Sequence, residues 1–367
     1  MNKNDREYNI QSNDNMRVLQ LIDSLRSGGA ERMSVTYASA LAKRIDASFL
    51  CCTRKEGLLK KQLSSDVGYL FLNKKNTLDL QAFIKLRRFV KENKIDLIQA
   101  HSSSWFLALL VKLSLPGVKL VWHDHYGREL SSRKPGLLKP ASKYFDGIIA
   151  VNNDLEEWSK KNLSSKEVRF FKNFLPENFG SGENMKLKGG DSIKIICVAN
   201  FRPQKDHLNL LKAFELIKKD HPKTTLHLLG KNEQDSYSVK IKKYIHHQDL
   251  NQDVFIYGEQ ENVSSYIDQA DLGILSSESE GLPMALLEYG RAGIPVISTD
   301  VGQCAEVIGS AGKLVAPQDS EALAQAIREY IENDQVRKSD ALSFQQVIKK
   351  TYSEEIIIPE VLDFFKH

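Results

Sequence analysis

Cysteine is scarce in this chain of 367 residues, and it is not clustered in a metal-binding pattern. The four cysteines, Cys51, Cys52, Cys197 and Cys304, form no C-x-x-C pair, and three of them lie within apolar runs. This spacing argues against a structural zinc site and against a disulfide framework. We therefore expect a protein of a reducing compartment.

Long hydrophobic runs are also missing. The most apolar region, residues 105–122, is interrupted by Lys112, Pro116 and Lys119, so it falls short of the ~20 apolar residues that a membrane span needs. Residues 1–16 are polar and partly acidic, unlike the basic and then apolar start of a signal peptide. We expect a disordered leader over residues 1–16 and a cytoplasmic protein without a transmembrane anchor.

A strong charge excess is the third absence. The net charge is only +4 with 27% charged residues, far from the basic excess of a dedicated nucleic-acid binder. The chain is longer than a single hydrophobic core usually serves, so two domains with a cleft between them are expected. A small-molecule or polymer substrate fits this composition better than nucleic acid.

What is present is a regular alternation of short β-rich runs with helical patterns, such as those over residues 31–43 and 78–93. This alternation is typical of parallel sheets covered by helices, and it predicts an α/β protein with two doubly wound, Rossmann-like domains. The predicted strands are 17–22, 48–53, 69–72, 96–100, 119–122 and 147–151 in the first half, and 194–198, 225–229, 254–257, 272–275 and 295–298 in the second.

A polar, glycine-rich stretch over residues 176–192 separates the two patterns and is the predicted linker. The first domain is then expected over 17–175 and the second over 193–345. Ligands of open parallel sheets bind beyond the carboxyl ends of the strands, so the loops after Val198, Leu275 and Ser298 should converge on one crevice.

The segment from Leu272 to Asp300 reads as strand, loop, helix and strand. Pro283 suits a first helical turn, and Gly281 lets the backbone approach a ligand closely. The amino end of this helix is an anion site suited to a diphosphate. Glu280 in the loop and Glu288 in the helix add acceptors for ligand hydroxyl groups.

Glu280, seven residues and then Glu288, followed by Gly293-Ile294-Pro295-Val296, closely resemble the group 1 (family 4) retaining glycosyltransferases. The resemblance implies the GT-B fold, with two Rossmann-like domains facing across a cleft. It also implies that Glu288 holds the ribose hydroxyls of the nucleotide and that Glu280 contacts the donor sugar. The backbone of Gly281 and Leu282 would help to hold sugar hydroxyls or phosphate.

A second match follows the strand at 194–198. The family places a basic pair on the donor diphosphate, and here Arg202 and Lys205 precede Asp206, a predicted N-cap. Many members carry the arginine five residues before the lysine, where this chain has Asn200. Lys205 is therefore the stronger candidate, and Arg202 could be only a surface charge.

The first domain contributes Gly28 and Gly29, in a Gly-Gly-Ala-Glu-Arg turn common in the same family. There the glycines let the loop approach the donor phosphates, although a plain tight turn would also need them. The family usually has a histidine at the end of a later strand facing the reacting sugar. His125 aligns best with it, His123 is the reserve, and His101 ends a neighbouring strand.

His123 and His125 also share one face of an extended segment, as a metal pair would, but no third ligand stands out nearby. No metal and no cofactor are therefore expected. Asn173 matches the family's closing asparagine, Glu306 fits a loop of the second domain, and the tail over 346–367 matches a last helix that crosses back to the first domain.

The first domain also carries a local charge excess, with 14 Lys/Arg against 5 Asp/Glu between residues 71 and 145, a net of +9 (14 − 5). Such a face suits an anionic membrane surface or an anionic saccharide, or it is an ordinary solvated face. The basic residues include Lys85, Arg87, Arg88, Lys91 and Lys94 on one predicted helix and Arg133, Lys134, Lys139 and Lys143 around Leu137 and Leu138.

Together these features predict a metal-independent transferase that moves a hexose or amino-hexose from a nucleotide-diphosphate sugar to a glycan or lipid-linked saccharide, with retention. A UDP-sugar is the expected donor and a GDP-sugar the alternative, and cell-surface polysaccharide biosynthesis is the expected context. An inverting enzyme needs a general base, for which only Asp124 is a close candidate. A two-domain sugar-nucleotide epimerase and a sugar-binding protein remain as alternatives, and peripheral contact with the inner face of the membrane is an open expectation.

Overall fold

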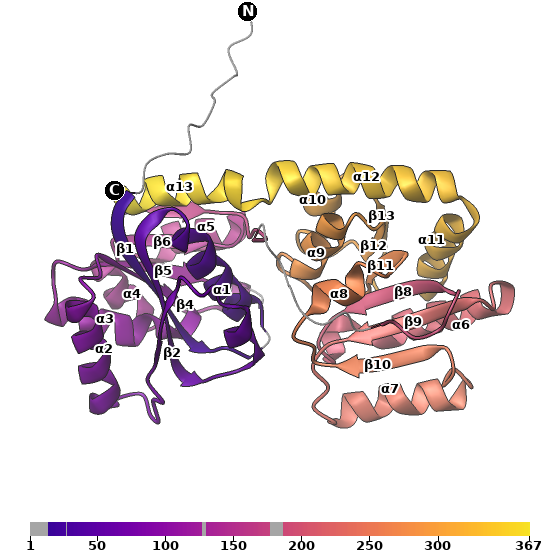
Figure 1. The fold of residues 1–367 in the computed structure, drawn as a ribbon, viewed down its shortest axis with the longest axis horizontal. Helices are drawn as coiled ribbons and strands as arrows, with labels where there is room; N and C mark the ends of the chain where they lie inside the picture. The colour runs from indigo at the N-terminus through magenta and orange to yellow at the C-terminus, as the bar shows by residue number, and fades with distance from the viewer. Residues whose placement is uncertain (1–13, 27, 127–129, 177–185) are drawn as a thin grey trace, which may run out of the picture.

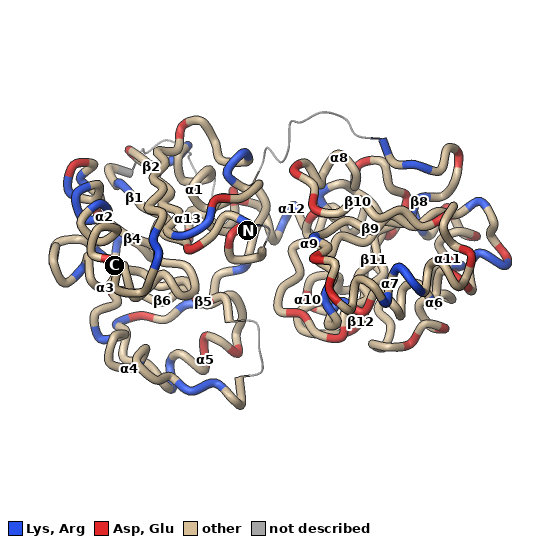
Figure 2. The backbone as a smooth tube through the Cα atoms, turned by 90° about the horizontal axis from the view of Figure 1, so that it is seen from below, with Lys and Arg blue, Asp and Glu red and all other residues tan. Residues whose placement is uncertain are grey.

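Two α/β domains lie side by side in the computed structural model, joined at the top by two consecutive C-terminal helices (Figure 1). The structure describes residues 14–26, 28–126, 130–176 and 186–367. Seen from below, the domains form two separate lobes (Figure 2). The predicted fold class, two doubly wound parallel-sheet domains, is confirmed.

The first domain is built on a parallel sheet with the strand order β3-β2-β1-β4-β5-β6-β7. Its strands read as nearly continuous apolar runs because helices cover both faces of the sheet. α2 and α3 pack on one face, whereas α1 and α13 pack on the other. The strands are β1 Asp14–Ser24, β2 Ile45–Lys55, β3 Gly68–Phe71, β4 Leu97–His101, β5 Lys119–Asp124, β6 Gly147–Ala150 and β7 Val168–Phe170.

The second domain repeats this arrangement with the order β10-β9-β8-β11-β12-β13. α6, α7 and α11 cover one face, and α8, α9, α10 and α12 cover the other. The strands are β8 Ile193–Val198, β9 Thr224–Leu229, β10 Val254–Gly258, β11 Leu272–Leu275, β12 Val296–Thr299 and β13 Lys313–Val315.

The helices follow the strands in the order expected of right-handed crossover connections. Those of the first domain are α1 Gly29–Ala42, α2 Leu80–Glu92, α3 Trp105–Ser114, α4 Leu138–Ala141 and α5 Asn153–Asn162. Those that follow are α6 His207–Asp220, α7 Ser236–His247, α8 Val263–Ile267, α9 Met284–Ala292, α10 Cys304–Ile308, α11 Ser320–Glu332, α12 Asp334–Thr351 and α13 Glu354–Lys366.

Both sheets reverse their strand order at one point, between β1 and β4 in the first domain and between β8 and β11 in the second. Ligands of doubly wound sheets bind in the crevice outside the strands at such a switch point. The loops after β1, β8 and β11 carry Gly28, Lys205 and Glu280. The topology therefore places predicted site residues of both domains at the switch points.

The main differences from the predicted strands are an earlier start of β1 and two additional strands. β1 begins at Asp14, so residues 14–16 are a strand and not part of the leader expected over 1–16, whose residues 1–13 lie outside the described part. Strands β7 and β13 were not predicted, because each has three half-buried residues and too short an apolar run to show a period.

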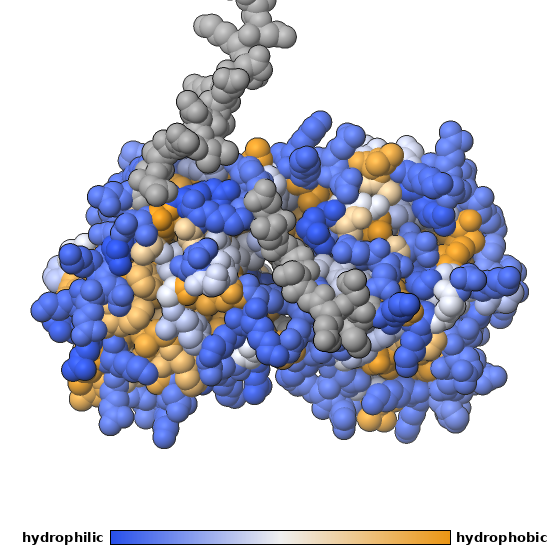
Figure 3. Space-filling view, in the orientation of Figure 1, coloured by the Kyte–Doolittle hydropathy of each residue, from blue (hydrophilic) through white to orange (hydrophobic). Residues whose placement is uncertain are grey.

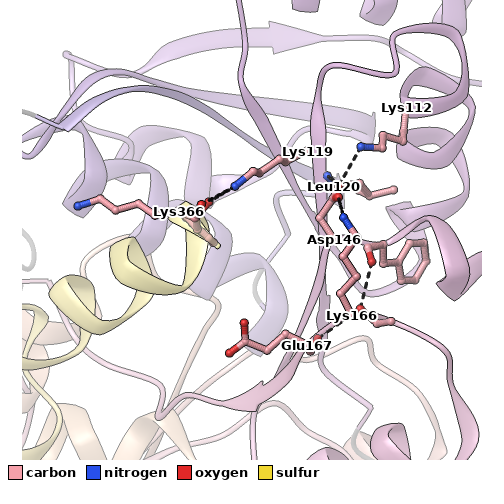
Figure 4. A network of polar contacts seen from close by, with 10 residues as sticks. Lys112, Lys119, Leu120, Asp146, Lys166, Glu167 and Lys366 are labelled. Carbon is pink, nitrogen blue, oxygen red and sulfur yellow. Dashed lines mark hydrogen bonds and ion pairs between the residues drawn. The ribbon is translucent and has the colours of Figure 1, made fainter.

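The C-terminal segment predicted as one helix over 346–367 is two helices. α12 continues to Thr351 on the second domain, and α13 begins at Glu354 and packs its buried face on the first domain. Figure 4 shows the end of α13 beside β5, where Lys119 Nζ donates to the carbonyls of Phe365 and Lys366 at 3.0 and 2.8 Å. The predicted return of the last helix to the first domain is confirmed, with a later start.

Candidate functional site

A cavity of about 260 Å³ opens between the two domains at their switch points. It is lined by loops that follow β1, β8, β9, β10 and β11 and by the amino-terminal parts of α1, α8 and α9. The lining residues are Gly28, Gly29, Arg32, Val198, Ala199, Asn200, Lys205, Leu229, Gly230, Lys231, Glu259, Gln260, Val263, Leu275, Glu280, Leu282, Pro283, Met284, Ala285 and Glu288.

Most of the predicted donor-site residues line this cavity: Gly28, Gly29, Lys205, Glu280, Leu282 and Glu288. Arg202, Gly281 and His125 are not among its lining residues. The loop after Ser298 also stays outside, where Gln303 donates its backbone N–H to the carbonyl of Gly281 at 3.1 Å. The loop after Ser298 thus contacts the Glu280 segment but does not line the cavity. The loops after β9 and β10, which were not predicted to do so, line it instead.

Glu288 lies on α9 with only 1% of its side chain exposed. Its Oε1 accepts a hydrogen bond from the Arg32 guanidinium of α1, so this ion pair crosses from one domain to the other. Its Oε2 is buried and has no partner among the described residues. Burial raises the pKa of the Glu288 carboxyl, and the positive charges of Arg32 and Arg291 oppose that rise.

α9 itself begins one residue later than predicted. Pro283 is its N-cap with extended backbone, not a residue of its first turn, and Met284 is the first helical residue. The helix still points its amino end into the cavity, because Pro283, Met284 and Ala285 are lining residues. Unpaired backbone N–H groups at such an end favour an anion.

Lys205 and Glu280 form the second charged pair of the cavity. Lys205 Nζ lies 2.5 Å from Glu280 Oε1, and Ser277 Oγ donates to the same oxygen at 2.6 Å. Lys205 is held in place by the start of α6, where the Asp206 carboxylate accepts the backbone N–H of Asn209 at 3.2 Å. The predicted N-cap role of Asp206 is thus confirmed.

Arg202 is exposed and is not among the residues that line the cavity. Its charge is felt by Glu31 of α1, whose pKa is raised by burial and lowered in part by Arg202. Asn200, which stands where many family members have their arginine, does line the cavity, and its Oδ1 accepts the backbone N–H of Lys231 at 2.9 Å.

The sequence reading missed several lining residues, chiefly Arg32, Lys231 and Glu259. Arg32 closes the Gly-Gly-Ala-Glu-Arg turn, so its position in the motif was the available signal. Lys231 follows Gly230, whose φ of +151° and closeness to the Ala199 carbonyl admit only glycine: a Cβ would lie 2.0 Å from that oxygen. A glycine directly after a predicted strand was the signal for this loop.

Three histidines gather at the carboxyl edge of the first sheet. The ring nitrogens of His101, His123 and His125 that could bind a metal lie within 4.8 Å of one another. The sequence analysis placed His101 at the end of a neighbouring strand and expected no third ligand beside His123 and His125, whereas the structure brings all three together. Burial lowers the pKa of all three, to about 3 for His125, so the rings are neutral near pH 7.

Asp124 is held by a partner. Arg133 donates to both of its carboxylate oxygens at 2.6 and 3.1 Å, and the guanidinium lies 4.0 Å from the centre of the Trp158 ring. Arg133 is therefore not part of an exposed basic face, contrary to the prediction. Both oxygens of Asp124 accept from arginine, which opposes a role as general base, whereas burial raises the pKa of its carboxyl.

Asn173 and Glu306 lie near the domain junction. Asn173 is buried and its Oδ1 has no partner among the described residues, while Lys172 beside it lies 3.6 Å from Glu306 of α10. Lys61 and Glu261 form a further pair between the domains at 2.6 Å. Neither Asn173 nor Glu306 reaches the cavity wall.

Comparison with known families accounts for most of the chain. Residues 183–343 match the family described as glycosyl transferases group 1, and residues 27–176 match the family described as glycosyltransferase family 4. The two matches cover the two domains separately.

Individual relatives agree with this. The O-antigen biosynthesis glycosyltransferase WbnH of Escherichia coli is 30% identical over 78% of this chain and 82% of its own length. The capsular polysaccharide biosynthesis glycosyltransferase CapH of Staphylococcus aureus is 24% identical over 80% and 83%. The crystal structure of Anabaena Alr3699/HepE with UDP and glucose superposes with a TM-score of 0.80 over 96% of this chain and 99% of that one, at 19% identity.

Proposed function

The chain belongs to the group 1 and family 4 glycosyltransferases, and we propose that it transfers a hexose or amino-hexose from a nucleotide-diphosphate sugar bound in the cavity between its domains. The observation that carries this proposal is the free Oε2 of Glu288. A buried carboxylate oxygen without a partner is costly, and a hydroxyl donor from a ligand removes that cost. The ribose of the nucleotide supplies such a donor.

The other residues of the cavity fit the remaining parts of a nucleotide sugar. Lys205 and the amino end of α9 offer positive charge to the diphosphate, and Gly28 and Gly29 let the first domain approach it closely. Glu280 offers acceptors for hydroxyls of the sugar. A UDP-sugar is the favoured donor because the similar HepE structures contain UDP, UDP and glucose, or UDP-glucose.

We also propose transfer with retention and without a metal, and the same arrangement supports this proposal. Lys205 and the helix dipole can neutralise the departing diphosphate, a task that a metal performs in other enzymes. Asp124, the only base candidate from the sequence, is engaged by Arg133, so the departing phosphate is the proton acceptor for the incoming hydroxyl. Attack then occurs on the face that the leaving group occupied.

Proton NMR of the product linkage tests retention once the donor is identified. An α-linked donor should give an α-linked product. A β-linked product would refute retention, and loss of activity in a folded Asp124→Asn variant would identify a missing base.

The acceptor we propose is a glycan or a lipid-linked saccharide of surface polysaccharide synthesis, in line with the printed roles of WbnH and CapH. Within the described residues, no helix is long and apolar enough to cross a bilayer. Peripheral membrane contact is proposed through α2, which carries Lys and Arg (Figure 2) beside the exposed Leu78, Leu80 and Ile84. Hydrophobic residues also interrupt the hydrophilic surface on this side of the first domain (Figure 3).

Calorimetry with UDP tests the donor site. Glu288→Ala should weaken UDP binding by about 1–3 kcal/mol, because it removes the acceptor for the ribose. Glu306→Ala is the matched control, since Glu306 lies outside the cavity and should leave the affinity unchanged. Equal affinity of the Glu288→Ala variant and the unchanged protein would sink the assignment.

A further inference from the structure

Two fully buried glutamines stand side by side in the apolar centre of the first sheet. Gln20 on β1 and Gln99 on β4 are both 0% exposed and are paired in register. Burying an amide among apolar side chains is unfavourable unless its hydrogen bonds are made, and an aliphatic residue would be the ordinary choice at either position. These amides therefore need an explanation that the donor cavity does not give.

The glutamines connect the three histidines at the edge of the sheet. Gln20 Nε2 donates to Gln99 Oε1 at 3.0 Å. On one side, Gln20 Oε1 lies 2.7 Å from His101 Nε2, and on the other, Gln99 Nε2 lies 2.9 Å from His123 Nδ1. His101 Nδ1 in turn lies 3.0 Å from His125 Nε2. We call this set the Gln–His relay.

The relay has one polarity along its whole length, because each amide has one donor end and one acceptor end. Gln20 Oε1 can only accept, so His101 carries its proton on Nε2 and leaves Nδ1 bare. Gln99 Nε2 can only donate, so His123 Nδ1 is bare and its proton is on Nε2. The bare Nδ1 of His101 then accepts the Nε2–H of His125.

All three neutral rings consequently carry the proton on Nε2. Turning both amides over reverses every bond and moves all three protons to Nδ1, so the rings change together or not at all. His123 Nε2 is buried and has no partner among the described residues. In this arrangement His123 Nε2–H is a hydrogen-bond donor without an acceptor among the described residues.

The same polarity opposes a metal in the cluster, although three nitrogens lie within 4.8 Å of one another. A metal would need bare nitrogens at His101 Nδ1 and His123 Nε2, the ring atoms that do not face the glutamines. His101 and His123 would then each direct an N–H group at a glutamine, so both glutamines would have to turn their Oε1 atoms toward the histidines. The two Nε2 amide groups of Gln20 and Gln99 would then face each other, donor against donor.

We propose that Gln20 and Gln99 are positioning residues that lock His101, His123 and His125 in one shared tautomer and so fix how these rings are oriented at the carboxyl edge of the first sheet. Three parallel neighbouring strands place the cluster at the same sheet edge as Gly28 of the cavity wall, although none of the three histidines is itself a lining residue. This inference rests on the proposed transferase function for its effect on kcat, but the tautomer lock itself does not.

Nitrogen-15 NMR of the full-length, histidine-labelled protein tests the lock directly. We expect His101, His123 and His125 to share the Nε2–H tautomer at pH 7.5, with His227 of the second domain as an internal reference. The observation of different tautomers within the cluster would overturn the proposal. No substitution and no donor are needed, so failure here is distinct from failure of UDP binding by the Glu288→Ala test.

Zinc titration gives a second test, in which a substitution is expected to strengthen binding and not to weaken it. Gln99→Glu replaces the amide by an acceptor-only carboxylate, which takes N–H groups from both Gln20 and His123 and frees His123 Nε2 as a ligand. Carboxylate partners of this kind strengthen metal–histidine sites, so zinc should bind about 10–100-fold more tightly than to the unchanged protein. Adding His123→Ala should abolish the gain. Equal zinc affinity with and without Gln99→Glu would contradict the relay.

Catalysis tests the positioning role once a donor is known. Gln99→Leu and Gln20→Leu should each lower kcat roughly tenfold, the effect of one misplaced hydrogen bond, with UDP affinity unchanged. Because both residues act through one relay, the double variant should lose no more than either single variant. Additive losses, or losses in UDP affinity instead of kcat, would show a merely structural role for the glutamines.

Discussion

Two basic residues of the cavity wall are each paired with a glutamate that the proposed mechanism also uses. Lys205 contacts Glu280, and Arg32 contacts Glu288. Such pairs hold the side chains in place, and because they are largely buried their charges interact more strongly than in bulk solvent. A donor diphosphate has to compete with Glu280 for Lys205. The interaction of Lys205 with the diphosphate should therefore strengthen as negative charge builds up on the leaving group.

Substitution of Lys205 tests this role. Because the charge on the leaving diphosphate grows toward the transition state, Lys205→Ala should lower kcat more than it raises KM for the donor. Arg202→Ala should have the smaller effect, since Arg202 is exposed and outside the cavity wall. Steady-state kinetics of both variants decide the matter, and a damaging Arg202→Ala with a silent Lys205→Ala would reverse the assignment.

Among the secondary-structure elements, α13 shows how a helix can join distant parts of the chain. Its buried side chains, such as Ile358 and Phe365, pack on β1 and α1. At its start the buried Glu354 accepts from Lys43 and Arg44 of the α1 end at 3.2 and 3.1 Å. The helix is therefore part of the first domain's core, although it is the last element of the chain.

Two isoleucines on α13 provide a matched test of this packing. Ile358 is 0% exposed, so Ile358→Ala should lower the free energy of unfolding by about 2–5 kcal/mol through lost burial and a cavity. Ile356 is 46% exposed, and Ile356→Ala should change it by less than ~0.5 kcal/mol. Urea unfolding measures both, and equal effects would mean that α13 is not docked as described.

At the scale of the whole molecule, buried histidines stand out in both domains. Burial lowers the pKa of His101, His123 and His125 in the first domain and, to about 4, that of His207 and His227 in the second. Folding thus keeps neutral five rings that would be charged in the unfolded chain below about pH 6.5.

The domains are further joined by ion pairs across the cleft, including the pair of Arg32 with Glu288.

Stability should therefore fall as the pH falls. Below about pH 6.5 the unfolded chain binds more protons than the folded one, so each of these histidines removes up to ~1.4 kcal/mol of stability per pH unit until its own folded pKa is reached. Glu288, with its raised pKa, works in the opposite direction. The free energy of unfolding, measured by urea at pH 7.5 and 5.5, should be clearly lower at pH 5.5.

Single substitutions locate the effect. His207→Gln should flatten the pH dependence, because one buried ring no longer titrates between the two states. Replacement of the exposed His246 and His247 by Gln should leave the slope as it was. A pH-independent stability, or a slope that only the exposed pair changes, would contradict the burial argument.

The sequence by itself determined the class of fold, most strands, the loops that carry Lys205 and Glu280, and the helix that carries Glu288. These follow from local patterns: the period of apolar residues, glycine and proline positions, and the spacing of two glutamates in one segment. Strand positions in particular can be predicted from neighbouring residues alone, because a strand that is buried on both faces of a parallel sheet is a continuous apolar run in the sequence.

Only the tertiary structure decided the partners of those residues. Arg32 and Glu288 are 256 positions apart, and Gln20 and His101 are 81 apart, so no local pattern relates them. Strand order brought β1, β4 and β5 together, and domain packing brought α1 against α9. The free oxygen of Glu288, the engaged Asp124 and the three joined histidines are all consequences of contacts between segments far apart in the chain, which periodicity and spacing do not encode.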